Sequence, residues 1–176
     1  MILVVDVDYR EGLAWAAGIL FRDWGDAEPT VEYVVECGVT GDYRPGAFFR
    51  RELPCIQQLL REITQSVTCI VVDGYVYLGR ERRPGLGKHL FDAMEQQTLV
   101  IGVAKTPFGD TPESTAVFRG GSIRPLYVTA AGVDECRAQQ WVRAMHGEHR
   151  IPTLLQRVDR LCRQASTEAV KQDDYS

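Results

Sequence analysis

The stretch that decides the fold is CIVVDGYVYLGRERR, from Cys69 to Arg83. It opens with an apolar run, residues 69–72, and stops abruptly on Asp73 and Gly74. A short run that is rich in β-branched residues is typical of a strand buried on both faces of a sheet. Ligands of open α/β sheets bind at the carboxyl ends of the strands, which makes Asp73 a candidate for chemistry. Gly74 allows a sharp turn or a close approach of a ligand. The alternative is a solvated aspartate before a turn.

Length and composition indicate one globular domain. The chain has 176 residues, of which 45% are hydrophobic and 25% charged, as in ordinary soluble proteins. We expect a single domain over residues 1–165 and a flexible C-terminal tail over residues 166–176. No apolar run is long enough to span a membrane and the N-terminus lacks signal-peptide features, so we expect a cytoplasmic protein without a membrane partner. The sequence does not indicate an oligomeric state.

Charge and cysteine content exclude some function classes. A net charge of −4 argues against a non-specific nucleic-acid binder, although a local basic patch is compatible with an acidic whole. The five cysteines form no CxxC pair. We therefore expect reduced cysteines and neither a zinc site nor a disulfide framework.

Apolar periodicity predicts a mixed α/β fold. Three strands with short connections form an expected antiparallel meander, and helices then alternate with strands, which indicates a mixed sheet with helices on its faces. The predicted strands are 2–7, 13–21, 30–37, 69–73, 99–104 and 123–129. The predicted helices are 48–63, 86–97, 133–145 and 153–163. Residues 106–121 are rich in Gly, Pro, Thr and Ser and are expected to be irregular.

Ionisable residues follow the apolar strands at three places. Asp6, Asp73 and Lys105 each end such a run. If these strands are neighbours, the three side chains converge at one edge of the sheet, and Glu52 in the first turns of a helix is a natural fourth member. Carboxylate clusters suit Mg²⁺, a hard cation that prefers oxygen ligands. Such a site can activate water for phosphoryl displacement.

Seven short motifs follow one another along the chain. They are VDVDY with Asp6, YRPG at 43–46, FRRELP at 49–54, VDG at 72–74, IGVAK at 101–105, PLYVT at 125–129 and RIP at 150–152. In this order they resemble the motifs of endonuclease V, a family of ribonuclease H-like nucleases that cut DNA or RNA next to deaminated bases, chiefly inosine. The resemblance covers about residues 2–162.

The resemblance implies a fold and a metal site. The fold would be a ribonuclease H-like mixed sheet, with its first three strands antiparallel and helices on both faces. Asp6, Asp73 and Glu52 would hold Mg²⁺, or alternatively Mn²⁺, and Lys105 would stabilise charge at the scissile phosphate or orient the water. Asp159 stands where the family has a histidine close to the metal, and it is a candidate fourth ligand.

The resemblance also implies a nucleic-acid surface. Tyr43, Pro45 and Gly46 would wedge the duplex apart, while the deaminated base enters a pocket near Gly74. The family cuts one nucleotide beyond the lesion on its 3′ side. A second group of candidates lies on the loop after Asp73, where they would border a phosphate path; these are Arg80, Arg82 and Arg83.

Two departures from the family pattern affect the expected activity. After D-G the family reads G-Q-G-x-x-H-P-R, but here Tyr75 and Tyr77 replace small residues and Gly79 stands at the histidine position. We therefore expect either slower cleavage or an altered choice of base. A relative that binds modified nucleic acid without cutting it is the alternative. A kinase-like ATPase of the same fold superfamily lacks the required second domain and phosphate loops.

Overall fold

The computed structural model describes residues 1–39 and 49–173. Within them, a seven-stranded mixed sheet has the order β3-β2-β1-β4-β7-β9-β8, and β5 and β6 form a separate hairpin. The strands are β1 (Ile2–Arg10), β2 (Leu13–Phe21), β3 (Val31–Val39), β4 (Cys69–Asp73), β5 (Tyr77–Leu78), β6 (Arg83–Pro84), β7 (Leu99–Ala104), β8 (Ala116–Val117) and β9 (Leu126–Ala131). The helices are α1 (Phe49–Glu62), α2 (Leu86–Ala93), α3 (Glu135–Ala144) and α4 (Thr153–Asp173), with a 3₁₀ turn η1 (Glu113–Thr115).

The strand directions confirm the expected mixed sheet. β1, β2 and β3 are antiparallel neighbours, whereas β1, β4 and β7 run parallel in the centre. β9 then runs antiparallel to β7. The carboxyl ends of the three central strands therefore lie at the same edge of the sheet.

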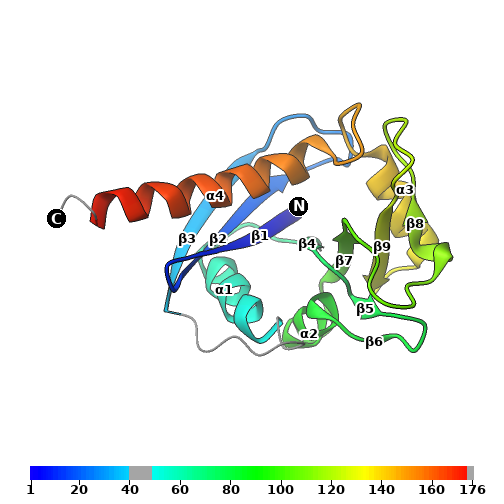
Figure 1. Cartoon of the computed structure of the whole chain (residues 1–176), viewed down its shortest axis with the longest axis horizontal. Coiled ribbons are helices and arrows are strands. Elements are labelled where there is room, and N and C mark those ends of the chain that lie inside the picture. The colour runs from blue at the N-terminus through cyan, green and yellow to red at the C-terminus, as the bar shows by residue number, and fades with distance from the viewer. Residues whose placement is uncertain (40–48, 174–176) are drawn as a thin grey trace.

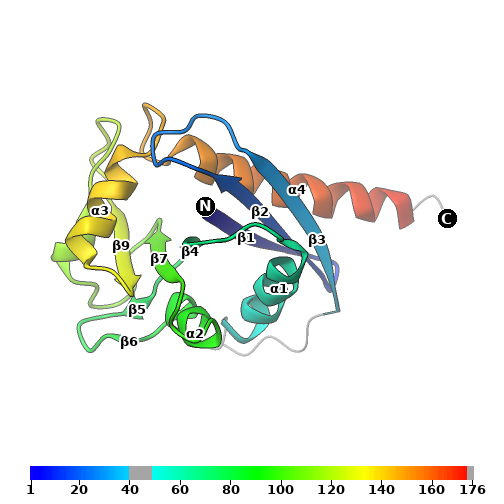
Figure 2. The ribbon, with the colours of Figure 1, turned by 180° about the vertical axis from the view of Figure 1, so that it is seen from behind.

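Helices cover both faces of the sheet, as expected (Figures 1 and 2). α3 and α4 pack on one face, where Leu154 and Val158 of α4 meet Val4 of β1 and Val71 of β4. α1 and α2 pack on the other. Alternation along each strand divides the apolar side chains between these two cores. No helix of the described segments is both long enough and apolar enough to cross a membrane.

Several predicted boundaries were wrong for local reasons. The helix expected over 86–97 ends at Ala93, because Glu95 and Gln96 adopt positive φ angles of 53° and 61°. The helix expected from Val133 begins at Glu135, because Asp134 caps it by accepting a hydrogen bond from the Arg137 backbone N–H at 3.2 Å.

The last predicted strand and the last helix also differ from expectation. β9 begins at Leu126 rather than at Ile123, which is 91% exposed and outside the sheet. α4 continues past the expected end at Arg163 to Asp173, and Ser166 within it is buried, with its hydroxyl donating to Asp8 at 2.6 Å. The segment 106–121, expected to be irregular, contains η1 and β8.

Candidate active site

Three central strands bring ionisable side chains to one edge of the sheet. Asp6 lies on β1, Asp73 ends β4, and Lys105 follows β7, and these strands are direct neighbours. Residues two apart on a strand point to the same face of the sheet. Asp6 and Asp73 each lie two residues after a valine of the core beneath α4, Val4 and Val71, and Lys105 lies two residues after Val103 of the same core. Asp6 and Asp73 are therefore on adjacent strands, as the sequence led us to expect, and both line one small cavity with Lys105.

Helix α4 adds a further carboxylate to this edge. Asp159 lines the same cavity, and its Oδ1 lies 3.9 Å from the Lys105 Nζ. The ammonium group is closer to Asp73, with 2.5 Å between Nζ and Oδ2. Arg163, one turn along α4, also pairs with Asp159 at 3.0 Å. Asp159 is thus held between two cations at the edge of the cluster.

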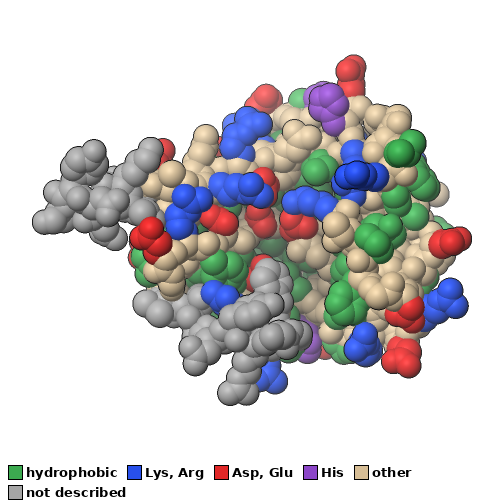
Figure 3. Space-filling view, in the orientation of Figure 1, with side chains coloured by type: hydrophobic (Ala, Val, Ile, Leu, Met, Phe, Trp, Pro, Cys, Tyr) green, Lys and Arg blue, Asp and Glu red, His purple; other side chains and the backbone are tan. Residues whose placement is uncertain are grey.

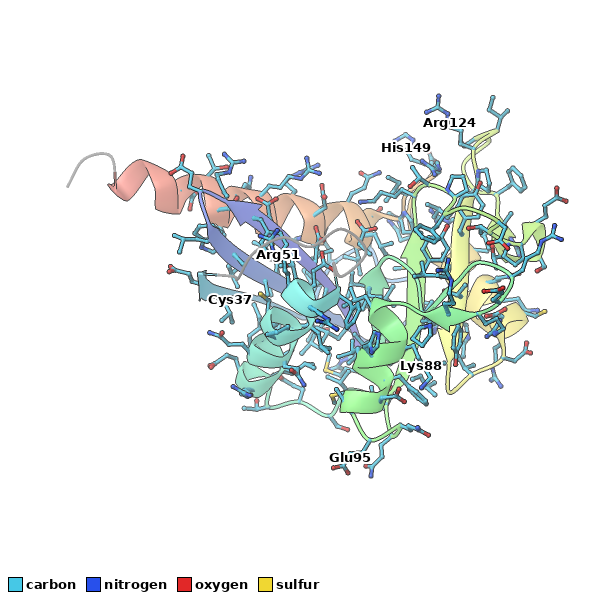
Figure 4. The ribbon with its side chains drawn as sticks, turned by 60° about the horizontal axis from the view of Figure 1, so that its bottom comes forward. Cys37, Arg51, Lys88, Glu95, Arg124 and His149 are labelled. Atoms are coloured by element: carbon cyan, nitrogen blue, oxygen red, sulfur yellow. The ribbon has the colours of Figure 1, made fainter. Side chains whose placement is uncertain are left out.

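Glu52 approaches from the opposite face of the sheet, on the first turn of α1. Its side chain is buried, with 6% of the residue exposed. Burial raises the pKa of Glu52 well above its usual range, and the negative charges of Asp6 and Asp73 raise it further. The neighbouring Arg51 opposes this effect; it is labelled in Figure 4, and its guanidinium lies 4.2 Å from the centre of the Tyr9 ring.

The cluster carries more negative than positive charge. Burial, followed by the charges of Asp73 and Asp159, raises the pKa of Asp6 from 3.8 to about 7. Burial lowers the pKa of Lys105, but the hydrogen bond and charge of Asp73 and the charges of Asp159 and Asp6 raise it by more. The raised pKa of Asp6 indicates that burial and the neighbouring negative charges outweigh the positive charge of Lys105.

The donor set fits a hard divalent cation, although its present arrangement does not form a finished site. All the candidate ligands are carboxylates, and a bound cation would favour the ionised form of Glu52, which burial disfavours. Across residues 1–39 and 49–173, however, no group of three His, Cys, Asp or Glu side chains is arranged to hold a metal ion. The ammonium of Lys105 supplies a positive charge next to Asp73 in this arrangement.

A largely apolar cavity of about 250 Å³ adjoins the carboxylates. Glu52, Asp73 and Gly74 form its polar side, and the rings of Tyr75 and Phe108 are part of its apolar lining. Tyr75 is 8% exposed and its hydroxyl donates to the backbone carbonyl of Thr106 at 2.8 Å. The size and lining suit a flat ring such as a nucleobase.

The backbone of residues 74–76 is held tightly below this cavity. Gly74 has a φ of 143°, which favours glycine. A Cβ on Gly102 of β7 would lie 2.6 Å from the Gly74 carbonyl oxygen and 2.7 Å from the Val76 nitrogen. The Val76 backbone N–H donates to Thr129 Oγ1 at 2.9 Å in a buried position. This packing fixes the chain directly after Asp73.

The basic loop beyond the cavity is exposed. Arg80, Arg82 and Arg83 are all accessible to solvent. Arg82 stacks over the Tyr77 ring at 4.1 Å and pairs with Glu135 of α3 at 2.9 Å. Arg83 lies 5.9 Å from the centre of the Phe108 ring, at the rim of the apolar cavity. Arg83 is therefore next to the candidate base pocket, whereas Arg82 is directed towards α3.

Two residues of this region had no role predicted from the sequence, although Arg150 belongs to the RIP motif. Arg150 donates from its guanidinium to the backbone carbonyls of Lys105 and Pro125 and so positions the strand end that carries Lys105. Nothing in the sequence marked Phe108 as a site residue, because it is one aromatic residue in a Gly- and Pro-rich segment. The proposed wedge residues Tyr43, Pro45 and Gly46 lie outside the described residues.

Comparisons with known proteins decide the family. The sequence model of the family described as endonuclease V matches residues 1–132. The chain belongs to the endonuclease V family. It is 31% identical to the endonuclease V of Streptomyces avermitilis, across 94% of this chain and 80% of that protein. The identity to the Streptomyces coelicolor endonuclease V is also 31%, across 94% and 78%.

Solved structures of endonuclease V share the fold. The Streptomyces avermitilis enzyme superposes with a TM-score of 0.78 at 28% identity, covering 96% of this chain and 82% of that one. The human protein ENDOV has a TM-score of 0.77 at 18% identity, covering 96% and 85%. The resemblance noted in the sequence is thus confirmed, and so is the ribonuclease H-like architecture that it implied.

Proposed function

We propose that this member of the endonuclease V family is a Mg²⁺-dependent endonuclease that cuts DNA or RNA 3′ to a deaminated base, chiefly inosine. The observation that carries the proposal is the convergence of Asp6, Asp73 and Asp159 with Lys105 at one sheet edge, with the buried Glu52 beside them. A cavity that suits a base adjoins this cluster. Family membership supports nuclease chemistry, and repair of deaminated nucleic acid in the cytoplasm is the role that we assign.

The chain's own groups would have distinct roles. Asp6, Asp73 and Glu52 would hold the metal ion, with Asp159 at the edge. Bound Mg²⁺, or Mn²⁺ in its place, supplies activation of water and stabilisation of the charge in an in-line displacement. Repulsion between a bound cation and the Lys105 ammonium would favour movement of the lysine away from Asp73, and the ammonium would then be available to the scissile phosphate.

The apolar cavity would hold the base. Extraction of a base costs a few kcal/mol, and least for one that is already mispaired. The exposed ring of Phe108 offers a surface for stacking and the buried Tyr75 adds to the apolar lining, while Glu52 and Asp73 lie at the polar side. Arg83 at the rim would contact a phosphate next to the extracted nucleotide.

A binding protein without cleavage activity is the second candidate. Gly79 stands where the family has a histidine, and Lys105 already neutralises Asp73. The carboxylates that remain favour the enzyme, because activation of water by a metal ion does not require that histidine.

The test is incubation of the protein with matched DNA and RNA strands that contain inosine, xanthosine, uracil or no lesion, with Mg²⁺ or EDTA. We expect Mg²⁺-dependent cutting at one position 3′ to inosine. Binding of a modified strand without any product would establish the binding-only alternative. Equal cleavage of strands with and without a deaminated base would contradict the assignment of the cavity to base binding.

A further inference from the structure

A groove of about 600 Å³ runs along α4 and begins at the candidate active site. Lys105 and Asp159 line its near end, and Thr167 and Glu168 line its far end. Residues three or four apart share one side of a helix, so Arg160 and its neighbours form a continuous strip along the groove. The groove therefore connects the carboxylate cluster with a polar surface that the roles assigned above do not use.

Basic side chains of this strip are available to an anionic ligand. Arg160 is exposed and makes no ion pair within the described residues. The side chain of Arg163 is 64% exposed while it contacts Asp159. Arg157, three residues before Arg160, is instead paired with Glu28 and Glu32 at 2.5 and 2.6 Å, in an adjoining hollow that Arg160 also lines. Figure 3 shows a row of Lys and Arg side chains along α4 with acidic side chains next to them.

Neutral polar side chains complete the strip. Gln156 and Gln164 lie one turn to either side of Arg160, and Gln156 Nε2 donates one hydrogen bond to the Ile151 carbonyl at 3.0 Å. Thr167 follows Arg163 by one turn; its hydroxyl donates to the Arg163 carbonyl at 2.7 Å and can accept from a ligand. Arginine, glutamine and threonine are side chains that contact phosphate and sugar oxygens. The negative charge of Glu168 at the far end marks where favourable contacts with a polyanion stop.

We propose that this α4 groove binds the sugar–phosphate backbone of the substrate strand on one side of the scissile bond, with Arg160 as its principal phosphate contact. The inference rests on the proposed function and adds a second contact region beyond the base cavity. A single strand fits better than a duplex because the groove lies beside one helix and leads directly to the site of cleavage. Binding in the groove does not depend on the base sequence, since its contacts are to the backbone.

The experiment measures binding in EDTA, so that cleavage cannot interfere. Fluorescently labelled strands that contain inosine would either end next to the scissile bond or extend by about ten nucleotides to its 3′ or 5′ side. One extended strand should bind more tightly than the short strand. Arg160→Gln should weaken only that strand, by about fivefold at 0.1 M salt, and lower its salt slope by about 0.7. The short strand should be unaffected.

Arg61→Gln is the matched control, because it removes the same charge from an exposed position on α1, across the sheet from α4. Equal effects of the two substitutions, or equal affinity of all three strands, would overturn the inference. Competition by an acidic peptide as strong as that by the extended strand would assign the groove to a protein partner instead. The binding experiment contains no metal, so it tests the groove alone. The proposed nuclease function is tested separately, by cleavage with the unaltered protein in the presence of Mg²⁺.

Discussion

The Nζ atom of Lys105 lies 2.5 Å from Oδ2 of Asp73, across the ends of two neighbouring parallel strands. The lysine thus supplies the positive charge that the carboxylates otherwise lack. A divalent cation bound to Asp73 would lie beside this ammonium group, and the two positive charges would repel each other. Lys105 would therefore weaken metal binding but assist cleavage, and a substitution can separate these two effects.

Lys105→Gln should bind Mg²⁺ more tightly and cut more slowly than the unaltered protein. Removal of the ammonium frees Asp73 for the metal ion, which we expect to strengthen binding several-fold. The scissile phosphate loses a positive group, and removal of one such contact typically costs about 10²–10³ in rate. Thermal unfolding against Mg²⁺ concentration gives the affinity, and single-turnover cleavage gives the rate. Weaker metal binding by the variant would mean that Lys105 supports the metal site.

Stability without metal should fall as the pH rises from about 4 to about 7. The folded protein holds a proton on Asp6 up to a pKa of about 7, whereas the unfolded chain releases it near 3.8. The stability from this group is fully present below about pH 4 and is lost as the pH rises through the folded pKa. In EDTA, Asp6→Asn should therefore stabilise the protein at pH 8.5, by a few kcal/mol at most, and by less at pH 5.5.

Chemical unfolding at the two pH values measures this difference. Asp92→Asn is a suitable control, because Asp92 is exposed and its hydrogen bonds to Lys88 lower its pKa. That substitution should give no stabilisation at either pH. If Asp6→Asn also fails to stabilise at pH 8.5, the carboxylates of the cluster do not oppose one another.

Much of this arrangement could be predicted from the sequence, because the central strands are apolar runs that stop on ionisable residues. The bounds of β2, β4 and β7 agree with those predicted from apolar periodicity alone. The neighbouring positions of Asp6, Asp73 and Lys105 followed from the same rule. Glu52 was placed correctly at the start of a helix, but its burial depends on packing between α1 and the sheet and has no local signal.

Features that depend on tertiary contacts could not be predicted. Ile123 and its neighbours look like a strand, but pairing with β7 begins only at Tyr127. The extension of α4 rests on contacts such as that between Ser166 and Asp8, which are far apart in the sequence. Phe108 lines the apolar cavity because of the path of a long loop, which residue type does not determine.

Gly102→Ala should destabilise the protein by roughly 1–3 kcal/mol and disturb the site. A Cβ at this position would meet the backbone of Gly74 and Val76, which cannot rotate away as a side chain can. Gly25→Ala is the control, because a Cβ there meets nothing within 4 Å. Urea unfolding measures both variants. Equal stability of the two would show that residues 74–76 are not held by β7 as tightly as we infer.

Restoring the family's histidine should raise the cleavage rate only in a double variant. Gly79 has a φ of 65°, and a Cβ there would lie 2.4 Å from Oδ1 of Asp110. Gly79→His alone should therefore strain the loop, whereas Gly79→His with Asp110→Ala should fit more easily. A positioned acid–base group typically contributes about 10²–10⁴ in rate. Single-turnover cleavage of inosine strands compares both variants with Asp110→Ala alone. No gain in the double variant would show that this histidine position is not limiting here.

The central claim is tested most directly by Asp73→Asn in a cleavage assay on an inosine-containing strand, with Mg²⁺ or with EDTA. The substitution keeps the size of the side chain and removes the charge that a hard cation needs. We predict Mg²⁺-dependent cutting by the unaltered protein and none by the variant, with circular dichroism and the unfolding midpoint showing that the variant is folded. Cutting by folded Asp73→Asn at the normal rate would contradict the account, because the metal site would then lie elsewhere.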